Sequence, residues 1–326
     1  AFNYNLERIR TFRTVFLREG DIRERRVDWN VLSHFHRGEY DTIVVTNYAF
    51  FTETAAILAL KAKRIPYEME LDGAVPRKEN ALLHAAKGIL IRGAARYWST
   101  GEQTDRFLLG FGVPKERITR YPFTSLFERE IAERPFSDAE KQAAKRKLSV
   151  PYKRMILSVG RPLHLKGFDL LIRAAAGLDG DAGVCIVGGK PTPECAELAE
   201  RLGLKNIRFI EFADRETLAA YYRAADLFVL ATRGDVWGLV INEAMANALP
   251  VITTDACVAG CEMIRDGENG FLIPSESAEL LEERMRRLLG DEALRTRMGG
   301  AALSTARRYT IEQMARAHAE AFSAYE

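Results

Sequence analysis

Short apolar runs alternate with longer stretches of helical spacing along the whole chain. In the first half, runs rich in β-branched and aromatic residues predict strands at Thr14–Leu17, Thr42–Thr46, Tyr67–Leu71 and Arg96–Ser99. Apolar residues that recur every three or four positions predict helices at Trp29–Arg37, Thr52–Lys63, Glu79–Arg92 and Glu102–Gly110.

The second half repeats this alternation with more strongly apolar runs. Buried strands are predicted at Met155–Val159, Val184–Val187, Ile207–Ile210, Leu227–Ala231, Val251–Thr253 and Gly270–Ile273. Helices are predicted between them at Lys166–Gly177, Thr192–Leu202, Asp214–Ala225, Leu239–Asn247 and Ser277–Leu289. Strands that alternate with helices of this length form parallel sheets with right-handed crossovers, so we predict an α/β protein with two Rossmann-like domains.

The boundary between the two domains is expected near residue 130. The segment 127–150 is polar and rich in Lys, Arg and Glu, which predicts a connection followed by an opening helix. We therefore expect domains at 1–130 and 131–310, and a C-terminal helix at 311–326 that returns toward the first domain. In the second domain, Thr192 and Asp214 are the expected N-cap residues of two helices.

The composition is that of a water-soluble globular protein and does not alter the predicted fold. Apolar residues make up 47% of the 326 positions and charged residues 28%, and the net charge of +2 argues against a nucleic-acid partner. No apolar run reaches the roughly 18 residues of a membrane helix, and the first residues lack the pattern of a signal peptide. Cys257 and Cys261 have no second Cys or His pair nearby, so we expect reduced cysteines, no zinc site and a cytoplasmic location.

The loop after the strand at Leu227–Ala231 has the features of an anion site. Its glycines allow a close backbone approach to a ligand, and it leads into a helix whose first amides are free to bind phosphate. Those amides belong to Gly238, Leu239 and Val240. Asp235 and Glu243 flank them, and carboxylates beside an anion are better suited to accept hydrogen bonds from sugar or ribose hydroxyls. The alternative is an acidic loop followed by an exposed helical Glu.

A second strand-to-helix turn carries cations. Gly160 ends the strand at Met155–Val159, and Arg161 and Lys166 follow within six residues. A forked Arg donor and a compact Lys charge together suit a diphosphate, although surface cations are often only solvated. Because ligands of open α/β sheets bind at the carboxyl ends of the strands, we expect both turns to meet at one ligand.

Four motifs in order carry a family resemblance. They are Gly160-Arg161-x4-Lys166-Gly167, Asp235-x7-Glu243 with the following Ala-Met-Ala, Pro250-Val-Ile252, and the run from Glu262 to Ile273. With this order and spacing, residues 154–326 resemble the retaining glycosyltransferases of family four. The resemblance implies a GT-B fold, in which the two Rossmann-like domains face each other across a cleft. It also implies a nucleotide-sugar substrate and no cofactor.

The resemblance further assigns roles to individual residues. Arg161 and Lys166 would hold the donor diphosphate, Asp235 the hydroxyls of the transferred sugar, and Glu243 the ribose. The remaining donor-binding positions are Gly160, Gly188, Phe212, Gly238, Leu239 and Val240, with Gly188 and Phe212 in turns near the base. One departure is that Asp235 stands where the family has Glu, so the sugar hydroxyl that it meets is open.

The first domain matches the family less well. Asp72 ends a strand where relatives often carry a His that faces the donor sugar, so we count it as a catalytic candidate, with a simple Asp-Gly turn as the alternative. Similarly, Tyr97–Glu102 is either the family's strand followed by a Ser turn or a capped helix start. The family's opening strand and Gly-rich loop are not recognisable, because the chain begins within the expected first helix around Asn3–Ile9.

The predicted function is metal-independent transfer of a hexose, from a UDP-sugar by preference, to a glycan or lipid-linked acceptor of cell-envelope synthesis. Residues 1–125 carry 20 Lys/Arg against 15 Asp/Glu, and residues 77–96, with five Lys/Arg and one acid, predict a basic amphipathic helix. This pattern predicts peripheral contact with an anionic membrane at its cytoplasmic face, against the alternative of a packed helix with solvated cations. A small soluble acceptor and a non-catalytic nucleotide-sugar-binding subunit are the other functional hypotheses.

Overall fold

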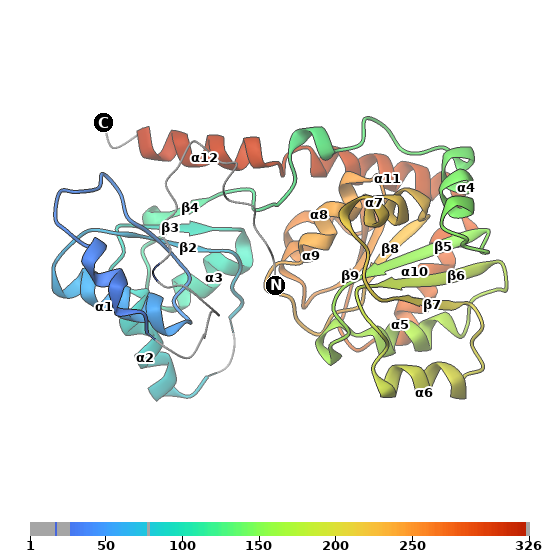
Figure 1. The fold of residues 1–326 in the computed structure, drawn as a ribbon, viewed down its shortest axis with the longest axis horizontal. Coiled ribbons are helices and arrows are strands. Elements are labelled where there is room, and N and C mark those ends of the chain that lie inside the picture. The colour runs from blue at the N-terminus through green and yellow to red at the C-terminus, as the bar shows by residue number, and fades with distance from the viewer. Residues whose placement is uncertain (1–16, 18–26, 77–78, 324–326) are drawn as a thin grey trace. The chain divides into compact units, whose positions relative to one another are not determined.

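Two compact units make up the chain in the computed structural model, which describes residues 17, 27–76 and 79–323 (Figure 1). Of the described residues, the first unit contains 17, 27–71, 79–98 and 108–119, and the second contains 72–76, 99–107 and 120–323. Two short segments that follow strands of the first unit are thus packed with the second one. The expected domain boundary near residue 130 stays a prediction.

The first unit is built on a four-stranded sheet with strand order β1-β2-β3-β4. The strands are β1 (Val44–Thr46), β2 (Glu68–Leu71), β3 (Arg96–Ser99) and β4 (Ile118–Arg120). The helices are α1 (Phe51–Ala62), α2 (Ala81–Ile91) and α3 (Glu102–Gly110). The buried indole of Trp98 donates a hydrogen bond of 2.6 Å to the buried Glu68 carboxylate, which joins β3 to β2 in the core.

A six-stranded parallel sheet forms the centre of the second unit, with strand order β10-β9-β8-β5-β6-β7. The strands are β5 (Arg154–Val159), β6 (Ala182–Val187), β7 (Ile207–Ile210), β8 (Leu227–Leu230), β9 (Val251–Thr254) and β10 (Gly270–Ile273). The order changes direction at β5, so the carboxyl ends of β5 and its neighbour β8 form the switch point where α/β sheets bind ligands.

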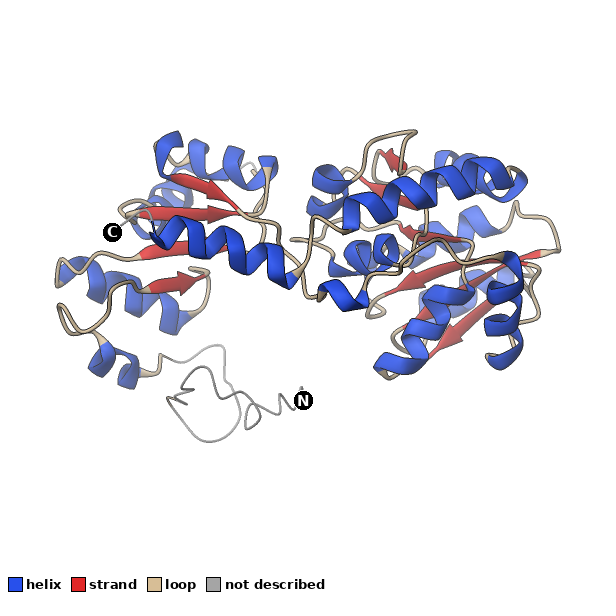
Figure 2. Cartoon of the chain, turned by 90° about the horizontal axis from the view of Figure 1, so that it is seen from above, coloured by secondary structure: helices blue, strands red, loops and turns tan. Residues whose placement is uncertain are grey.

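Helices cover both faces of this sheet, as Figures 1 and 2 show. Helices α5 (Phe168–Ala175), α6 (Pro193–Arg201) and α10 (Ala278–Gly290) pack in one apolar cluster. The other cluster takes in α4 (Asp138–Lys147), α7 (Arg215–Ala224), α8 (Leu239–Ala246) and α9 (Val258–Met263). Helix α11 (Glu292–Ala306) contributes to both clusters, and α12 (Ile311–Ser323) follows it. The sheet is therefore buried on both faces, as its apolar strands require.

Most elements lie where the sequence pattern placed them. All six strands of the second sheet were expected within two residues of their observed ends, and the helix caps at Thr192 and Asp214 are confirmed by hydrogen bonds to backbone amides. The region Trp29–Arg37 is instead a 3₁₀ helix that ends at His34, because its side chains bury too little to sustain a longer α-helix. Two predicted elements lie outside the described residues: the helix around Asn3–Ile9 and the strand at Thr14–Leu17, of which only Leu17 is described.

Candidate functional site

The loops after β5 and β8 pack directly against each other. Gly167 has φ +65°, and a Cβ on it would lie 1.8 Å from the carbonyl oxygen of Ala231. Two hydrogen bonds to the Leu165 carbonyl, from the Arg233 amide (2.7 Å) and the Thr232 hydroxyl (2.8 Å), join the loops further. A glycine is therefore required at this turn, and the two predicted strand-to-helix corners are brought together.

An ion pair lies where these corners meet. The Nζ of Lys166 is 2.5 Å from Oδ2 of Asp235, and both side chains are largely buried, at 19% and 16% exposure. The Asp235 amide donates to the carbonyl of Ala256 and its own carbonyl accepts from Val258, so the β8 loop is fixed to the start of α9. A cation for phosphate and a carboxylate for hydroxyls are thus held side by side.

Helix α8 begins beside this pair with free amides. Gly238 is its N-cap residue with φ +104°, and a Cβ on it would lie 2.8 Å from the sulfur of Cys257 and 3.6 Å from Asp235 Oδ2. The amides of the first helical turn, at Leu239 and Val240, have no partner within the helix. Together with the helix dipole they favour an anion next to Lys166.

Gly160 and Gly188 form a second close contact at this edge of the sheet. Gly188 has φ +130°, and a Cβ on it would lie 2.4 Å from the Gly160 carbonyl oxygen, so the turns after β5 and β6 touch through backbone alone. The side chain of Arg161 is exposed and forms no ion pair with the described residues, and Phe212 on the loop after β7 is 85% exposed. Both side chains are accessible to a ligand.

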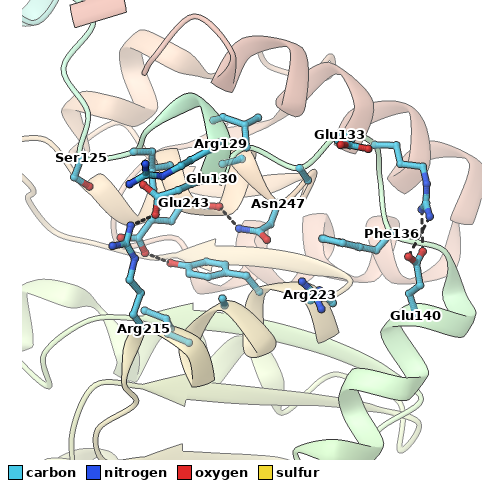
Figure 3. A pocket seen from close by; sticks show the side chains of 18 residues that line it. Ser125, Arg129, Glu130, Glu133, Phe136, Glu140, Arg215, Arg223, Glu243 and Asn247 are labelled. Atoms are coloured by element: carbon cyan, nitrogen blue, oxygen red, sulfur yellow. Dashed lines mark hydrogen bonds and ion pairs between the residues drawn. The ribbon is translucent and has the colours of Figure 1, made fainter. Parts of the chain in front are cut away.

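The Glu243 side chain lines a cavity, whereas Lys166 and Asp235 form the ion pair at the corner of the two loops. The cavity has a volume of about 820 Å³ and lies between α7, α8 and the segment 125–136, where Glu243 Oε2 accepts a 2.6 Å hydrogen bond from the Tyr222 hydroxyl (Figure 3). Burial raises the pKa of the Glu243 carboxyl, and the bond from Tyr222 and the charge of Arg215 offset part of that rise. Sequence reasoning missed Tyr222, because nothing in the α7 pattern distinguishes it from a core aromatic residue.

Asp72 lies in a segment that packs with the second unit. Gly73 has φ +142°, and a Cβ on it would lie 1.8 Å from the carbonyl oxygen of Val236, the residue after Asp235. The Ala74 amide donates to the Thr104 hydroxyl at 3.1 Å, which fixes the turn. Burial raises the pKa of the Asp72 carboxyl, as expected of an acid held in a closed turn.

Arg233 and a group of three other arginines were not anticipated from the sequence. Arg233 forms a two-pronged ion pair with Asp169 at 2.7 and 2.8 Å and a second pair with Glu276, so it ties the β8 loop to the start of α5. The group of three lines a cavity of about 320 Å³ with Thr100, Glu262 and Tyr309, and its members are Arg120, Arg265 and Arg308. No spacing signal could have found this group, because its members are far apart in sequence.

Comparison with protein families agrees with this arrangement. The model of the family described as glycosyl transferases group 1 matches residues 140–305. Among curated proteins, a D-inositol 3-phosphate glycosyltransferase from Corynebacterium glutamicum is 33% identical over 189 residues, which is 54% of this chain and 45% of the relative. The chain thus spans about half the length of the curated relatives that it matches.

Solved structures share the fold. The Anabaena protein Alr3699/HepE, solved with UDP and glucose, superimposes with a TM-score of 0.74 at 20% identity, over 88% of this chain and 78% of that one. The C-terminal domain of the Francisella tularensis group 1 protein LpcC is 28% identical with a TM-score of 0.52, over 57% of this chain and 100% of that domain. With the family model and these neighbours in agreement, the chain belongs to the group 1 glycosyl transferases and has their GT-B fold.

Proposed function

We propose that this protein is a retaining glycosyltransferase that moves a hexose from a nucleotide-diphosphate sugar, with UDP-sugar favoured, to an acceptor hydroxyl. The observation that carries the proposal is the corner where Lys166, Asp235 and the first amides of α8 meet. A cation and free amides suit a diphosphate, and the adjoining carboxylate suits the hydroxyls of the sugar attached to it. That Alr3699/HepE is solved with UDP and glucose supports this choice of donor.

In the proposed reaction, the bond from the anomeric carbon to the phosphate oxygen breaks and the acceptor oxygen bonds to that carbon, while the acceptor's hydroxyl proton passes to the departing diphosphate. Negative charge builds on the departing diphosphate, and Lys166, Arg161 and the amides of Gly238–Val240 would stabilise it without a metal ion. Asp235 would accept hydrogen bonds from the transferred sugar, and Asp72 would lie near the reacting centre. Such preorganised charges supply the largest contribution to catalysis in many enzymes.

The acceptor that we propose carries a phosphate group. Arg265 and Arg308 line the 320 Å³ cavity and form no ion pair with the described residues, whereas Arg120 pairs with Asp105 at 2.8 Å. Three arginines thus outnumber the one acid of the lining, Glu262. Unpaired guanidinium groups around a cavity favour an anionic ligand with several acceptor oxygens. The phosphorylated acceptor in the names of the curated relatives supports this. The glycan or lipid-linked acceptor of cell-envelope synthesis is the alternative, and a lipid-linked one presents phosphate as well.

A panel of nucleotide sugars and acceptors tests the proposal. We expect one nucleotide sugar to raise the melting temperature, because a ligand at about 100 times its Kd stabilises the folded state by roughly 2.7 kcal/mol. With that donor, transfer to an inositol phosphate should be faster than to unphosphorylated inositol. If no nucleotide sugar shifts the melting temperature, the chain does not bind a donor and the proposal is wrong.

A peripheral membrane contact at the cytoplasmic face is proposed from α2. Leu82 and Ile89 are 83% and 62% exposed on this helix, and Lys87, paired with Glu79, lies between them. No helix in the described part of the chain is long and apolar enough to cross a bilayer. A surface helix with exposed apolar side chains and flanking cations binds anionic lipid at the headgroup level.

We therefore expect co-sedimentation with anionic vesicles that is lost at high salt. Replacing Leu82 and Ile89 together with Ser should weaken this binding by about tenfold or more, since each removes a large apolar side chain from lipid. Vesicles of neutral lipid are the control. Equal sedimentation of the double variant and the parent would show that α2 does not contact lipid.

A further inference from the structure

The hydrogen bond between Tyr222 and Glu243 connects two helices of the second unit. Tyr222 lies in the last turns of α7 and is 3% exposed, and its hydroxyl donates to Glu243 Oε2 at 2.6 Å. Both residues line the cavity between α7 and α8, in which Figure 3 labels Glu243. A phenol buried this deeply has to find an acceptor, and here the acceptor is the carboxylate expected to bind ribose.

The neighbouring Tyr221 packs in the same cluster without such a bond. Tyr221 is 6% exposed on the same helix, and its hydroxyl makes no hydrogen bond with the described residues. Both rings belong to the same apolar cluster, and the two positions differ in the polar contact of the hydroxyl. The pair therefore offers a test that separates packing from hydrogen bonding.

The bond leaves the second carboxylate oxygen of Glu243 without a described side-chain partner. The backbone carbonyl of Glu243 accepts from the Asn247 side chain at 2.9 Å, which holds the last turn of α8 and not the carboxylate. A carboxylate with one oxygen fixed by a neutral donor can still accept hydrogen bonds from two vicinal hydroxyls. A ribose presents such a pair.

We propose that Tyr222 is a positioning residue for Glu243, which fixes one carboxylate oxygen so that the other faces the ribose hydroxyls of the donor nucleotide. This inference rests on the proposed function, since it assumes that Glu243 contacts the ribose. Without the phenolic hydroxyl, the Glu243 carboxylate would lose its only described side-chain donor and would no longer be held in one rotamer. Nucleotide binding would therefore weaken.

The bond also affects the pKa of the Glu243 carboxyl. The charged or titratable groups that face Glu243 are Tyr222 and Arg215 on α7, and Glu130 and Arg129 on the covering segment, where Glu130 pairs with Arg215. Burial raises the pKa of Glu243, whereas the Tyr222 bond lowers it. Removing the hydroxyl thus raises this pKa further, and the carboxylate becomes protonated at a higher pH. Affinity for the nucleotide should then fall at a higher pH than in the parent.

The test is titration calorimetry on Tyr222→Phe, Tyr221→Phe and Glu243→Ala, using UDP, GDP, ADP and TDP and following the one that the parent binds best. We expect Kd at neutral pH to rise about tenfold in Tyr222→Phe, as for loss of a hydrogen bond to a charged group, and by less than twofold in Tyr221→Phe. As the pH is lowered, the affinity for the nucleotide should begin to fall at a higher pH in Tyr222→Phe than in the parent. Tyr221→Phe should follow the parent. Circular dichroism spectra establish that each variant is folded.

The possible outcomes distinguish a failure of this inference from a failure of the proposed function. If Glu243→Ala weakens binding and Tyr222→Phe matches the parent at every pH, Tyr222 has no positioning role and the proposed function stands. If both tyrosine variants weaken binding equally with no change in pH profile, their role is packing and the inference is wrong. If Glu243→Ala binds as the parent does, the ribose contact assigned to Glu243 fails.

Discussion

Replacing Lys166 with Ala is expected to lower kcat/KM for glycosyl transfer by about 10²–10³. In the structure, Lys166 pairs with Asp235 at 2.5 Å beside the first amides of α8, where the leaving diphosphate would lie. Its removal takes away a preorganised cation that stabilises charge developing on the phosphate, and the loss of one such group costs roughly 3–4 kcal/mol. It also leaves Asp235 uncompensated next to an anion, so donor binding should weaken as well.

The measurement is steady-state transfer with the nucleotide sugar that binds the parent best. Lys153→Ala is the control, because Lys153 is exposed and its pair with Asp181 is long, at 3.9 Å. Asp235→Asn separates the two roles, since it keeps the lysine and removes the carboxylate; we expect it to slow transfer more than it weakens binding of the nucleoside diphosphate. A Lys166→Ala variant within fivefold of the parent would show that the diphosphate lies elsewhere.

The second sheet could be predicted from the sequence because its strands are buried on both faces. Runs such as Val184–Val187 and Leu227–Ala231 have almost no polar positions, which is typical of parallel strands between two helix layers. Strand β4 was missed because Ile118–Arg120 is three residues long, half exposed and at the end of the sheet, so no apolar run marks it. Helix α11 was missed because its apolar residues face both core clusters and show no single stripe.

The candidate site was predictable only where it depends on local backbone. Gly167 and Gly238 adopt left-handed conformations at the turns that the glycine pattern indicated, so the meeting of the two corners follows from the sequence and the parallel sheet. Contacts between side chains far apart in the chain were not predictable. The bond between Tyr222 and Glu243 and the Arg233–Asp169 pair depend on how α7, α8 and α5 pack, which no spacing rule gives.

The carboxylate of Asp226 supports the opposite end of the same sheet from the proposed site. It is 1% exposed at the start of β8, and its Oδ2 accepts from Lys145 Nζ at 2.7 Å and from the Met155 amide at 2.8 Å. Lys141 and Arg154 lie within 3.7 Å of its other oxygen. One buried anion thus compensates several cations and joins α4 to β5 and β8.

Replacing Asp226 with Ala is expected to lower the free energy of unfolding of the second unit by about 3–5 kcal/mol. The reason is that Lys145, itself 2% exposed in its side chain, would remain as a buried charge whose only described partner is the Lys153 carbonyl. Breaking a buried ion pair by removing one partner costs this much because the other charge stays desolvated. Chemical denaturation followed by circular dichroism measures the effect. Asp181→Ala, at a 78% exposed carboxylate, should change stability by less than about 0.5 kcal/mol.

A double variant decides whether the cost comes from the unpaired lysine. With Asp226→Ala and Lys145→Met combined, the buried charge is gone and an apolar chain of similar length takes its place, so we expect much of the lost stability to return. No recovery would mean that the bond to the Met155 amide, and not the ion pair, carries the stabilisation. Because the pair lies at the amino ends of the strands, nucleotide affinity of the folded variants should equal that of the parent, which separates this support of the fold from the chemistry at the carboxyl ends.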